Sequence, residues 1–448
     1  MPDSDIRARS VEVEFSPAVL RTPLKFGSGM VTDITLAEVT AEVENRSGRT
    51  ARGRGAILLS DLWAWPGKLA HATRDTAMRR LTQRLAELFS GGEFGHPIDL
   101  YWDRKKTMLE IAAELSAEAN LAEPINALTV LMCASPIDAA VHDGFGLANG
   151  ISSYDGYGRE FMANDLSRYL GPEFAGRYPQ EFLTASVAET LPVFHLVGGV
   201  DKLTEDEVGP GDPRDGLPVS LDQWIRRDGV FCLKIKLRGT DAEWDSQRTA
   251  EVDRVARQTL GAIGQSDAPC LSVDFNEICA SPEYVIEYCR KLQERSRTAF
   301  DDLLYLEQPT ERDLYAHRFD MHELARIKPV VVDESVLDIE MLRLAFTLGW
   351  SGVALKTCKG QTNCLMYIAL ASQQGRSYSV QDLTNPGLAL VHSASLTGRC
   401  RPMMGFEYNA RQYLPDACRE VQDRHPGLFA VRAGRVRPGD LPRSGLGY

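Results

Sequence analysis

Three acidic residues in the middle of the chain each follow a short apolar run. Asp274 ends Leu-Ser-Val-Asp, Glu307 ends Leu-Tyr-Leu-Glu, and Asp333 ends Val-Val-Val-Asp. If these runs are neighbouring parallel strands, the three carboxylates converge at one edge of a sheet and repel one another. A hard divalent cation relieves this repulsion, and oxygen ligands with open coordination positions suit Mg²⁺. The pattern therefore predicts a metal site, with Mg²⁺ as the cofactor and Mn²⁺ as the alternative ion.

Lysines flank the three acids on the strands before and after them. Lys234 and Lys236 lie two residues apart in Cys-Leu-Lys-Ile-Lys, so their side chains point to the same side of a strand. Their mutual repulsion, with a cation nearby, favours the neutral amine of one of them, and a neutral lysine is a competent general base. Lys356 ends Gly-Val-Ala-Leu-Lys, four strands further round an eight-stranded barrel, and should face Lys236 across the metal site.

Two lysines on opposite sides of a metal-bound carboxylate predict chemistry at the carbon next to that carboxylate. The metal would stabilise the charge that develops, as an enediolate, when this carbon loses its proton. Two bases on opposite faces of the carbon allow racemisation, whereas one base and one cation allow elimination or ring closure. A single charged strand end is ordinary solvated surface, but acids and lysines on successive strands indicate an active site.

The segments that carry these residues alternate between strand and helix. Charged strand ends recur at intervals of about 25 to 40 residues, close to the length of one βα unit. Some eight such units close into a barrel of roughly 250 residues, and residues 191–415 have about that length. The expected strands are Pro192–Val197, Phe231–Leu237, Cys270–Phe275, Leu303–Leu306, Val330–Val332, Val353–Leu355 and Tyr378–Val380, and the expected helices are Ser246–Ile263, Pro282–Arg297, Ile339–Leu348 and Cys364–Gln374.

The first 150 residues follow a different pattern. Three segments of strand character, separated by turn signals, predict a three-stranded meander. Three later segments place apolar residues at helical spacing. The expected strands are Val11–Phe15, Ile34–Val43 and Gly55–Leu59, and the expected helices are Thr76–Leu88, Lys106–Ala117 and Ala127–Leu147.

The composition excludes several classes of partner. The chain has 448 residues, enough for two domains, and a formal net charge of −12 that disfavours nucleic acid and anionic membranes. A bound cation would still attract a small carboxylate. No apolar run approaches the roughly 18 residues of a membrane span. Nine scattered cysteines without a C-x-x-C pair, and an N-terminus without an apolar leader, predict a cytoplasmic protein with reduced thiols.

Taken together, the motifs resemble the enolase superfamily, in the branch of muconate-lactonizing enzymes, o-succinylbenzoate synthases and dipeptide epimerases. The resemblance covers nearly the whole chain. The sixth-strand lysine, and a seventh strand that ends in Gln381-Asp382 without a histidine, argue against the mandelate racemase branch. The matching motifs are K-x-K at Lys234–Lys236, D-x-N at Asp274–Asn276, E-Q-P at Glu307–Pro309, D-E-S at Asp333–Ser335 and the sixth-strand lysine Lys356.

The resemblance implies a fold and a set of roles. The fold class would be α/β, with an α+β capping domain in residues 1–150, a (β/α)7β TIM-like barrel in residues 151–415, and a C-terminal segment, 416–448, that packs back on the cap. Asp274, Glu307 and Asp333 would hold Mg²⁺, and Lys236 and Lys356 would form the acid/base pair. The substrate contacts would be Lys234, Asn276, Asp382, Glu407, Lys25 and Trp63.

Some of these substrate contacts have an alternative interpretation. Asp382 either touches the substrate or caps the segment Thr384-Asn385-Pro386 that follows it. Lys25 and Trp63 belong to the two cap loops, Thr22–Met30 and Ser60–Gly67, that largely set specificity in this superfamily. Trp63 would otherwise serve as packing between the cap and the barrel.

Other positions depart from the family pattern or fall outside the expected site. Glu334 follows Asp333 directly and should point to the other side of its strand, and Lys359 should lie outside the pocket. The eighth strand carries Glu407, an acid seen in lactonizing enzymes, but lacks the D-x-D of dipeptide epimerases. The Gly- and Pro-rich stretch Glu205–Pro218 lengthens the link between the first two barrel strands, as a lid or as a simple insertion.

The resulting hypothesis is a Mg²⁺-dependent enzyme that removes the α-proton of a small-molecule carboxylate, as a racemase, epimerase or cycloisomerase. One alternative is a lyase on the same scaffold, such as an acid-sugar or other hydroxy-acid dehydratase, or a synthase of the o-succinylbenzoate type. A more remote alternative is a barrel that binds metal and carboxylate without turnover. A homo-oligomer is expected, with neither nucleic acid nor membrane as a partner.

Overall fold

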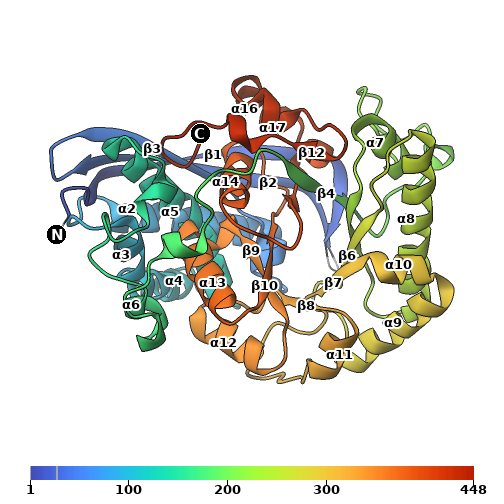
Figure 1. Ribbon diagram of the computed structural model, residues 1–448. Coiled ribbons are helices and arrows are strands. Elements are labelled where there is room, and N and C mark those ends of the chain that lie inside the picture. Colours follow the sequence, from blue (N-terminus) through green and yellow to red (C-terminus); the bar gives the residue numbers. More distant parts are fainter. Residues whose placement is uncertain (1, 27–28) are drawn as a thin grey trace.

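A computed structural model describes residues 2–26 and 29–448, and the side chains of residues 24–29 lie outside this description. The N-terminal region forms a three-stranded antiparallel sheet in the order β1, β2, β3 (Figure 1), which confirms the predicted meander. Strand β1 is much longer than predicted, because its pairing with β2 continues well beyond Phe15. The strands are β1 (Ile6–Phe26), β2 (Gly29–Asn45) and β3 (Thr50–Leu58).

Helices cover one face of this sheet, and one of them packs very tightly on it. A Cβ atom on Gly53 or Gly55 of β3 would lie 2.0 Å from the carbonyl oxygen of Ala140 or 2.1 Å from that of Pro136, both on helix α5. Only glycine allows this approach of strand to helix. The helices of this region are α1 (Asp61–Ala64), α2 (His71–Phe89), α3 (Pro97–Trp102), α4 (Lys105–Glu118) and α5 (Ala127–Asn149), of which α1 and α3 were not predicted.

Eight parallel strands, β4 to β11, form a barrel that closes by pairing β11 with β4, as the predicted fold class requires. Closure brings the two strands so near that a Cβ atom on Gly405 would lie 1.6 Å from the carbonyl oxygen of Pro192. The barrel strands are β4 (Leu191–Val197), β5 (Cys232–Lys236), β6 (Cys270–Asp274), β7 (Leu303–Glu307), β8 (Val330–Val332), β9 (Gly352–Lys356), β10 (Ser377–Gln381) and β11 (Phe406–Glu407).

Helices on the outside of the barrel connect its strands (Figure 1), and the predicted ones agree with the observed bounds to within about a turn. They are α7 (Leu221–Asp228), α8 (Ala242–Ala262), α9 (Pro282–Arg295), α10 (Arg297–Asp302), α11 (His322–Ile327), α12 (Ile339–Thr347), α13 (Gln361–Gln373) and α14 (Gly387–Gly398). Four short helices lie in the segments before and after the barrel: α6 (Ser167–Leu170), α15 (Ala410–Tyr413), α16 (Arg419–Arg424) and α17 (Pro426–Phe429).

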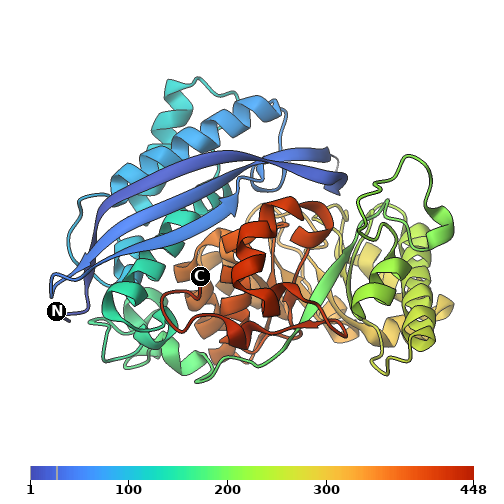
Figure 2. The same ribbon diagram turned by 90° about the horizontal axis from the view of Figure 1, so that it is seen from above.

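The β1–β2 hairpin and the C-terminal segment connect the cap with the barrel. The β1–β2 hairpin extends along the barrel (Figure 2), and Arg21 on it contacts the inserted stretch through Asp215 at 2.5 Å and the carbonyl oxygen of Pro218 at 3.1 Å. In the C-terminal segment, β12 (Arg435–Val436) pairs antiparallel with β4. The backbone N of Leu446 donates to Asp143 Oδ1 on α5 at 2.8 Å.

The exact domain boundaries stay a prediction. Across the described ranges, no helix combines the length and apolarity that a membrane crossing needs.

Candidate active site

Five charged side chains meet where consecutive barrel strands end. Lys236 on β5 lies in register with Asp274 on β6, and Asp274 lies in register with Glu307 on β7. Asp333 directly follows β8, and Lys356 ends β9. The carboxyl ends of parallel barrel strands open on one face, so residues far apart in the sequence converge there.

Lys234 lies at the centre of this cluster and is almost completely buried. Its Nζ is 2.9 Å from Glu307 Oε1, 3.2 Å from Asp274 Oδ2 and 3.3 Å from Glu407 Oε2. Burial alone would lower the pKa of Lys234, but attraction to the surrounding carboxylates, Glu307 first, outweighs burial and raises the pKa well above its usual value. Lys234 therefore stays protonated, which suits the binding of an anionic group rather than proton abstraction.

Lys236, two residues further along β5, occupies a more open position, with its side chain 11% exposed. Its Nζ lies 2.5 Å from Asp274 Oδ2 and 3.1 Å from Asn276 Oδ1. Asn276 is held in turn, because its backbone N donates to Asp274 Oδ1 at 2.8 Å. Both Lys236 and Asn276 line an opening of about 320 Å³ at the mouth of the barrel. Lys236 can therefore exchange protons with solvent more readily than the buried lysines.

Lys356 enters from the opposite side of the barrel and is buried. Its Nζ lies 2.6 Å from Asp333 Oδ2 and 4.9 Å from the centre of the Trp63 ring. Burial lowers the pKa of Lys356, but Asp333 outweighs burial and raises the pKa above its usual value. As expected, Lys359 does not line the small cavity that Lys234, Lys236 and Lys356 share. Its Nζ nevertheless contacts Asp333, at 2.5 Å from the carbonyl oxygen and 3.2 Å from Oδ1.

The three predicted metal ligands form a buried set of oxygen donors. Burial, and then repulsion from Asp274, raises the pKa of Glu307 to about 8. For Asp333, burial raises the pKa, but the lysines beside it outweigh burial and lower it. In the described part of the chain, no three acids already stand as a coordination shell, since lysine ammonium groups lie between them. Three buried carboxylates nevertheless make a donor set that fits a hard cation such as Mg²⁺.

The cap reaches the site through Trp63, whose side chain is fully buried. Its Nε1 donates to Glu334 Oε1 at 3.0 Å, and Asn276 Nδ2 donates to the same oxygen at 3.3 Å. The carbonyl oxygen of Trp63 accepts from Arg312 Nη1 on the barrel at 3.2 Å. Trp63 therefore packs between cap and barrel and covers Lys356, and Glu334 accepts hydrogen bonds both from the cap and from Asn276 of the site.

Strands β10 and β11 bring a second group of polar side chains to the same cavity. Glu407 ends β11, and its Oε2 accepts from the backbone N of Asp382 at 3.2 Å. Asp382 Oδ1 accepts from the backbone N of Thr384 at 2.8 Å and from Asn409 Nδ2 at 3.3 Å. One oxygen of Asp382 thus caps the segment that follows it, as one interpretation of the sequence held. Asn409 was not predicted, although it stands two residues after Glu407.

Two further amide side chains of the site were not predicted. Gln381 Nε2 donates to Glu307 Oε2 at 2.7 Å, and its Oε1 accepts from Lys234 Nζ at 3.1 Å, so the amide links the two. Gln308 Oε1 accepts from the backbone N of Asp333 at 2.8 Å and holds that strand end in place. Each amide directly neighbours a predicted acid, and Gln308 is also the middle residue of the E-Q-P motif.

Backbone strain accompanies these side chains. Four non-glycine residues at the ends of barrel strands have a positive φ: Asn276 at 44°, Glu277 at 62°, Gln308 at 29° and Thr384 at 65°. This left-handed conformation is unfavourable for residues with a Cβ and concentrates at functional sites. The strain therefore supports the view that this end of the barrel is the working face.

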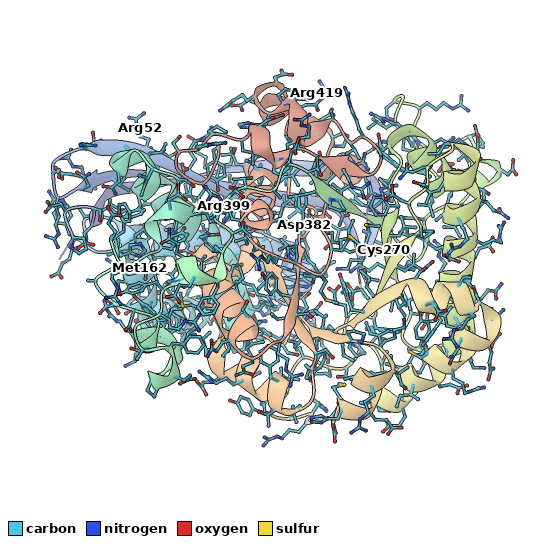
Figure 3. All side chains as sticks on the ribbon, in the orientation of Figure 1. Arg52, Met162, Cys270, Asp382, Arg399 and Arg419 are labelled. Carbon is cyan, nitrogen blue, oxygen red and sulfur yellow. The ribbon has the colours of Figure 1, made fainter. Side chains whose placement is uncertain are left out.

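Lys234, Lys236 and Lys356 all line one small cavity of about 30 Å³. Val31 and Ile34 of the cap close it, together with barrel residues that include Asp382, which lies near the centre of the barrel (Figure 3). The predicted contact of Lys25 falls on a side chain outside the described residues. Since Lys236 also lines the larger opening, the two spaces adjoin at this residue.

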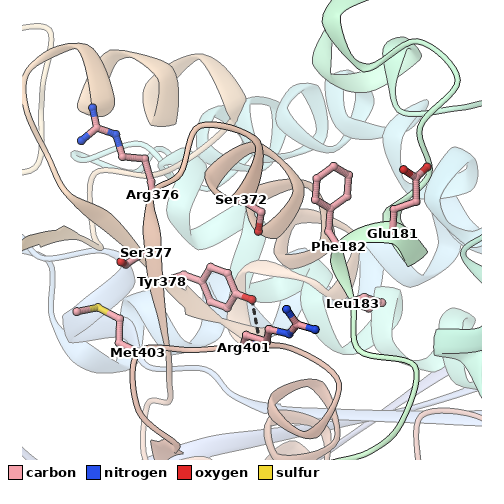
Figure 4. Close-up of a pocket in the computed structure, with 9 residues that line it drawn as sticks. All are labelled: Glu181, Phe182, Leu183, Ser372, Arg376, Ser377, Tyr378, Arg401 and Met403. Atoms are coloured by element: carbon pink, nitrogen blue, oxygen red, sulfur yellow. Dashed lines mark hydrogen bonds between the residues drawn. The ribbon is translucent and has the colours of Figure 1, made fainter.

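A larger groove, of about 370 Å³, lies at the opposite end of β10 and includes none of the predicted site residues. Tyr378 and Arg401 line it, and the backbone N of Arg401 donates to the Tyr378 hydroxyl at 2.8 Å (Figure 4). Ser377 and Tyr378 begin the strand, whereas Gln381 ends it at the charged face. The size of this groove therefore does not mark it as the site of chemistry.

Several solved structures share the whole fold. An L-Ala-D/L-Glu epimerase from Bacillus subtilis is 16% identical, with a TM-score of 0.62 over 98% of both chains. A muconate lactonizing enzyme from Pseudomonas fluorescens, complexed with muconolactone, is 17% identical, with a TM-score of 0.58 over 98% of this chain and 96% of that one. An enolase from Bradyrhizobium, complexed with magnesium and mandelic acid, is 14% identical, with a TM-score of 0.60 over 99% and 95%.

A search of curated protein sequences found no match. The sequence profile of the family described as enolase C-terminal domain-like matches residues 218–448, which is just over half of the 448-residue chain. The profile spans β5 to β11 and therefore every charged strand end described above. The chain thus belongs to the enolase C-terminal domain-like family, and with it to the enolase superfamily of barrel enzymes.

Proposed function

We propose that the chain catalyses Mg²⁺-dependent abstraction of the α-proton of a small-molecule carboxylate, as a racemase, epimerase or cycloisomerase. One observation carries this proposal. Lys236 and Lys356 line the same cavity from strands on opposite sides of the barrel, with buried carboxylates beside both. Solved relatives described as complexes with a dipeptide, mandelic acid or muconolactone support a carboxylate substrate.

Asp274, Glu307 and Asp333 are the residues that would hold the cation. When bound, Mg²⁺ would draw the substrate carboxylate to the site and stabilise the negative charge that develops beside it. Lys236 and Lys356 each pair with one carboxylate of this set. A carboxylate that shares its charge with a cation would hold its lysine less strongly, which would leave the lysine amine available as a general base.

Lys234 keeps a different part in this proposal. Its Nζ is surrounded by three carboxylates and stays charged, so it would bind the anionic end of the substrate. The base lysine would then take the proton from one face of the α-carbon. In a racemisation, the facing lysine would return a proton to the other face of the α-carbon. In a cycloisomerisation, the facing lysine would remain a cation.

A lyase reaction, such as dehydration of a hydroxy acid, is the second candidate, and the asymmetry of the two lysines, which suits ring closure equally well, favours it over racemisation. Lys356 is buried beside Asp333 and under the Trp63 ring, which both stabilise its cationic form. One base and one fixed cation suit elimination of a leaving group.

The cytoplasmic location and the homo-oligomeric state of the protein stay predictions.

Proton exchange separates these candidates. The chain is incubated with Mg²⁺ and a library of carboxylates in D₂O, and deuterium uptake at the α-carbon is followed by NMR. We expect uptake without net product for a racemase, a new ring for a cycloisomerase, and an enol or keto acid for a lyase. Lys236→Ala/Lys356→Ala should abolish all three signals, while Lys106→Ala, an exposed lysine elsewhere, should change none. Unchanged exchange in the double variant would contradict the roles of the two lysines, and no exchange by the wild type with any carboxylate would favour a barrel that binds without turnover.

A further inference from the structure

The cavity that the three lysines share is too small to enclose a whole substrate. Its volume of about 30 Å³ has room for about two water molecules, or for one carboxylate group. Ligand sites usually measure several hundred Å³, because they enclose most of the bound molecule. A carboxylate that binds among the lysines therefore needs further room for the rest of the molecule. The opening of about 320 Å³ adjoins the cavity at Lys236 and offers this room.

Apolar side chains from three loops form a wall of this opening. Val200 follows β4, Trp244 lies in the first turn of α8, and Ile278 follows β6. Val200 and Ile278 are 62% and 42% exposed. The Cζ atom of Arg238 lies 3.9 Å from the centre of the Trp244 ring and covers one face of it. Exposed apolar side chains that gather beside a cavity are typical of a ligand-binding surface.

The charged side chains at the opening are both cations. Lys236 and Arg238 line it, and within the described ranges no acidic side chain does. A positively charged group of a ligand would be repelled here, whereas a carboxylate would be attracted and an uncharged group would be accepted. The opening therefore suits a carboxylate whose remaining part is apolar and carries no positive charge.

Contacts between the loops hold this wall in place. A Cβ atom on Gly239, in the loop after β5, would lie 3.0 Å from the Cβ atom of Ile278, so the loops after β5 and β6 pack directly on each other. The loop that carries Val200 is held by Arg248 of α8, whose Nη2 donates to the carbonyl oxygen of Gly198 at 2.8 Å. A wall that is ordered before binding loses little conformational entropy when a ligand covers it.

We propose that Val200, Trp244 and Ile278 form a subsite for the apolar end of the substrate, which is therefore a carboxylate with an aromatic or bulky aliphatic group. This inference rests on the proposed function. The carboxylate would lie among the lysines in the small cavity. The apolar group would leave the cavity past Lys236 and cover the wall. The loops after β4, β5 and β6 would thus contribute to specificity, on the side of the barrel where Lys236 stands.

Matched pairs of ligands test this subsite. The probes are phenylacetate, 3-phenylpropionate and 4-phenylbutyrate, compared with acetate, propionate and butyrate, which lack the ring. The affinity of each probe is measured by calorimetry with Mg²⁺ present. We expect at least one phenyl compound to bind about tenfold or more tightly than its partner, because burial of the ring removes apolar surface from water. If no phenyl compound binds more tightly than its partner, the subsite is rejected.

Ile278→Asp is the decisive variant, because it places a carboxylate on an exposed part of the wall. We expect the preference for the phenyl compounds to disappear, and Trp244→Ala should reduce it without a change of charge. Ile263→Asp is the matched control, since Ile263 is 41% exposed at the far end of α8. Its preference should equal that of the wild type. A preference that persists in both wall variants would overturn the proposal.

Light scattering and α-proton exchange complete the test. If Ile278→Asp broke up an oligomer and left the ligand preference intact, the wall would be a contact between copies of the chain, and the proposal would fail. A preference that Ile278→Asp removes, without α-proton exchange in D₂O for any carboxylate, would uphold the subsite and count against the catalytic proposal. Exchange without any preference for the phenyl compounds would uphold the catalytic proposal and reject the subsite.

Discussion

The two facing lysines stand in different surroundings. Lys236 is partly exposed, pairs with Asp274 and lies beside an opening to solvent. Lys356 is buried, shares Asp333 with Lys359 and lies under the ring of Trp63. An open lysine with a solvent path is suited to exchange protons, and a lysine enclosed by a carboxylate and an aromatic ring is suited to remain a cation. The two lysines therefore occupy nearly symmetric positions on the barrel, but their surroundings suit them to different chemical roles.

Single substitutions of the two lysines test this comparison with the largest expected effect on the reaction rate. Lys236→Ala and Lys356→Ala should each lower the rate of α-proton exchange by about 10² to 10⁴-fold, because a positioned acid or base is lost. The measurement is deuterium uptake by each enantiomer of a substrate separately. If the lysines serve opposite faces, each variant loses exchange from a different enantiomer. If Lys356 acts only as a cation, both variants lose exchange from the same one.

The metal proposal predicts the next largest effect, because the cation would lie between the two lysines. Glu307→Gln should remove Mg²⁺ binding in calorimetry, since a central carboxylate of the donor set is lost. Gln308→Ala should weaken binding by about 10 to 100-fold, because Gln308 holds the strand end of Asp333. Glu420→Gln, on an exposed helix, serves as the control. Full Mg²⁺ affinity in Glu307→Gln, or α-proton exchange that persists in EDTA, would contradict the proposal.

Trp63→Phe tests the surroundings of the buried Lys356 alone. The substitution keeps an aromatic ring over Lys356 but removes the Nε1–H that donates to Glu334. Glu334 Oε1 keeps its second donor, Asn276 Nδ2, so the loss of one hydrogen bond should destabilise the protein by about 0.5 to 1.5 kcal/mol and lower the melting temperature. We expect the reaction step that depends on Lys356 to slow by roughly tenfold, while the step that depends on Lys236 is unchanged. Equal slowing of both steps would show that the cap does not distinguish the two sides; Trp65→Phe is the matched control.

A buried acid away from both lysines provides the reference, with no expected effect on exchange. Burial raises the pKa of Asp143 to about 6, against hydrogen bonds from Leu446 and Arg54 that lower it. Between about pH 4 and pH 6 the folded state binds more protons than the unfolded state, so stability falls as the pH rises through this window. Relative to Asp143→Asn, the wild type should lose about 1 to 3 kcal/mol of unfolding free energy from pH 4 to pH 7. A constant difference in denaturant unfolding at both pH values would refute this.

Much of the barrel follows from local pattern alone. Apolar runs bounded by charge predicted seven of the strands to within a few residues, because a strand buried on both faces needs a continuous apolar segment. The cap strand β1 was predicted far too short, since its extension depends on pairing with β2 rather than on its own alternation. The eighth strand was located through Glu407, but its short extent, Phe406–Glu407, depends on closure onto β4 beside the close backbone contact at Gly405.

The sequence by itself determined which charges share the site. Parallel strands that close into a barrel must bring Lys236, Asp274, Glu307, Asp333 and Lys356 to one face, whatever their detailed packing. Only the tertiary structure decided how these groups differ from one another. The pairing of Trp63 with Glu334 joins residues 271 positions apart, and the approach of Lys359 to Asp333 depends on a turn outside the strand. Such contacts arise from the docking of cap on barrel and from side-chain packing, which strand periodicity does not encode.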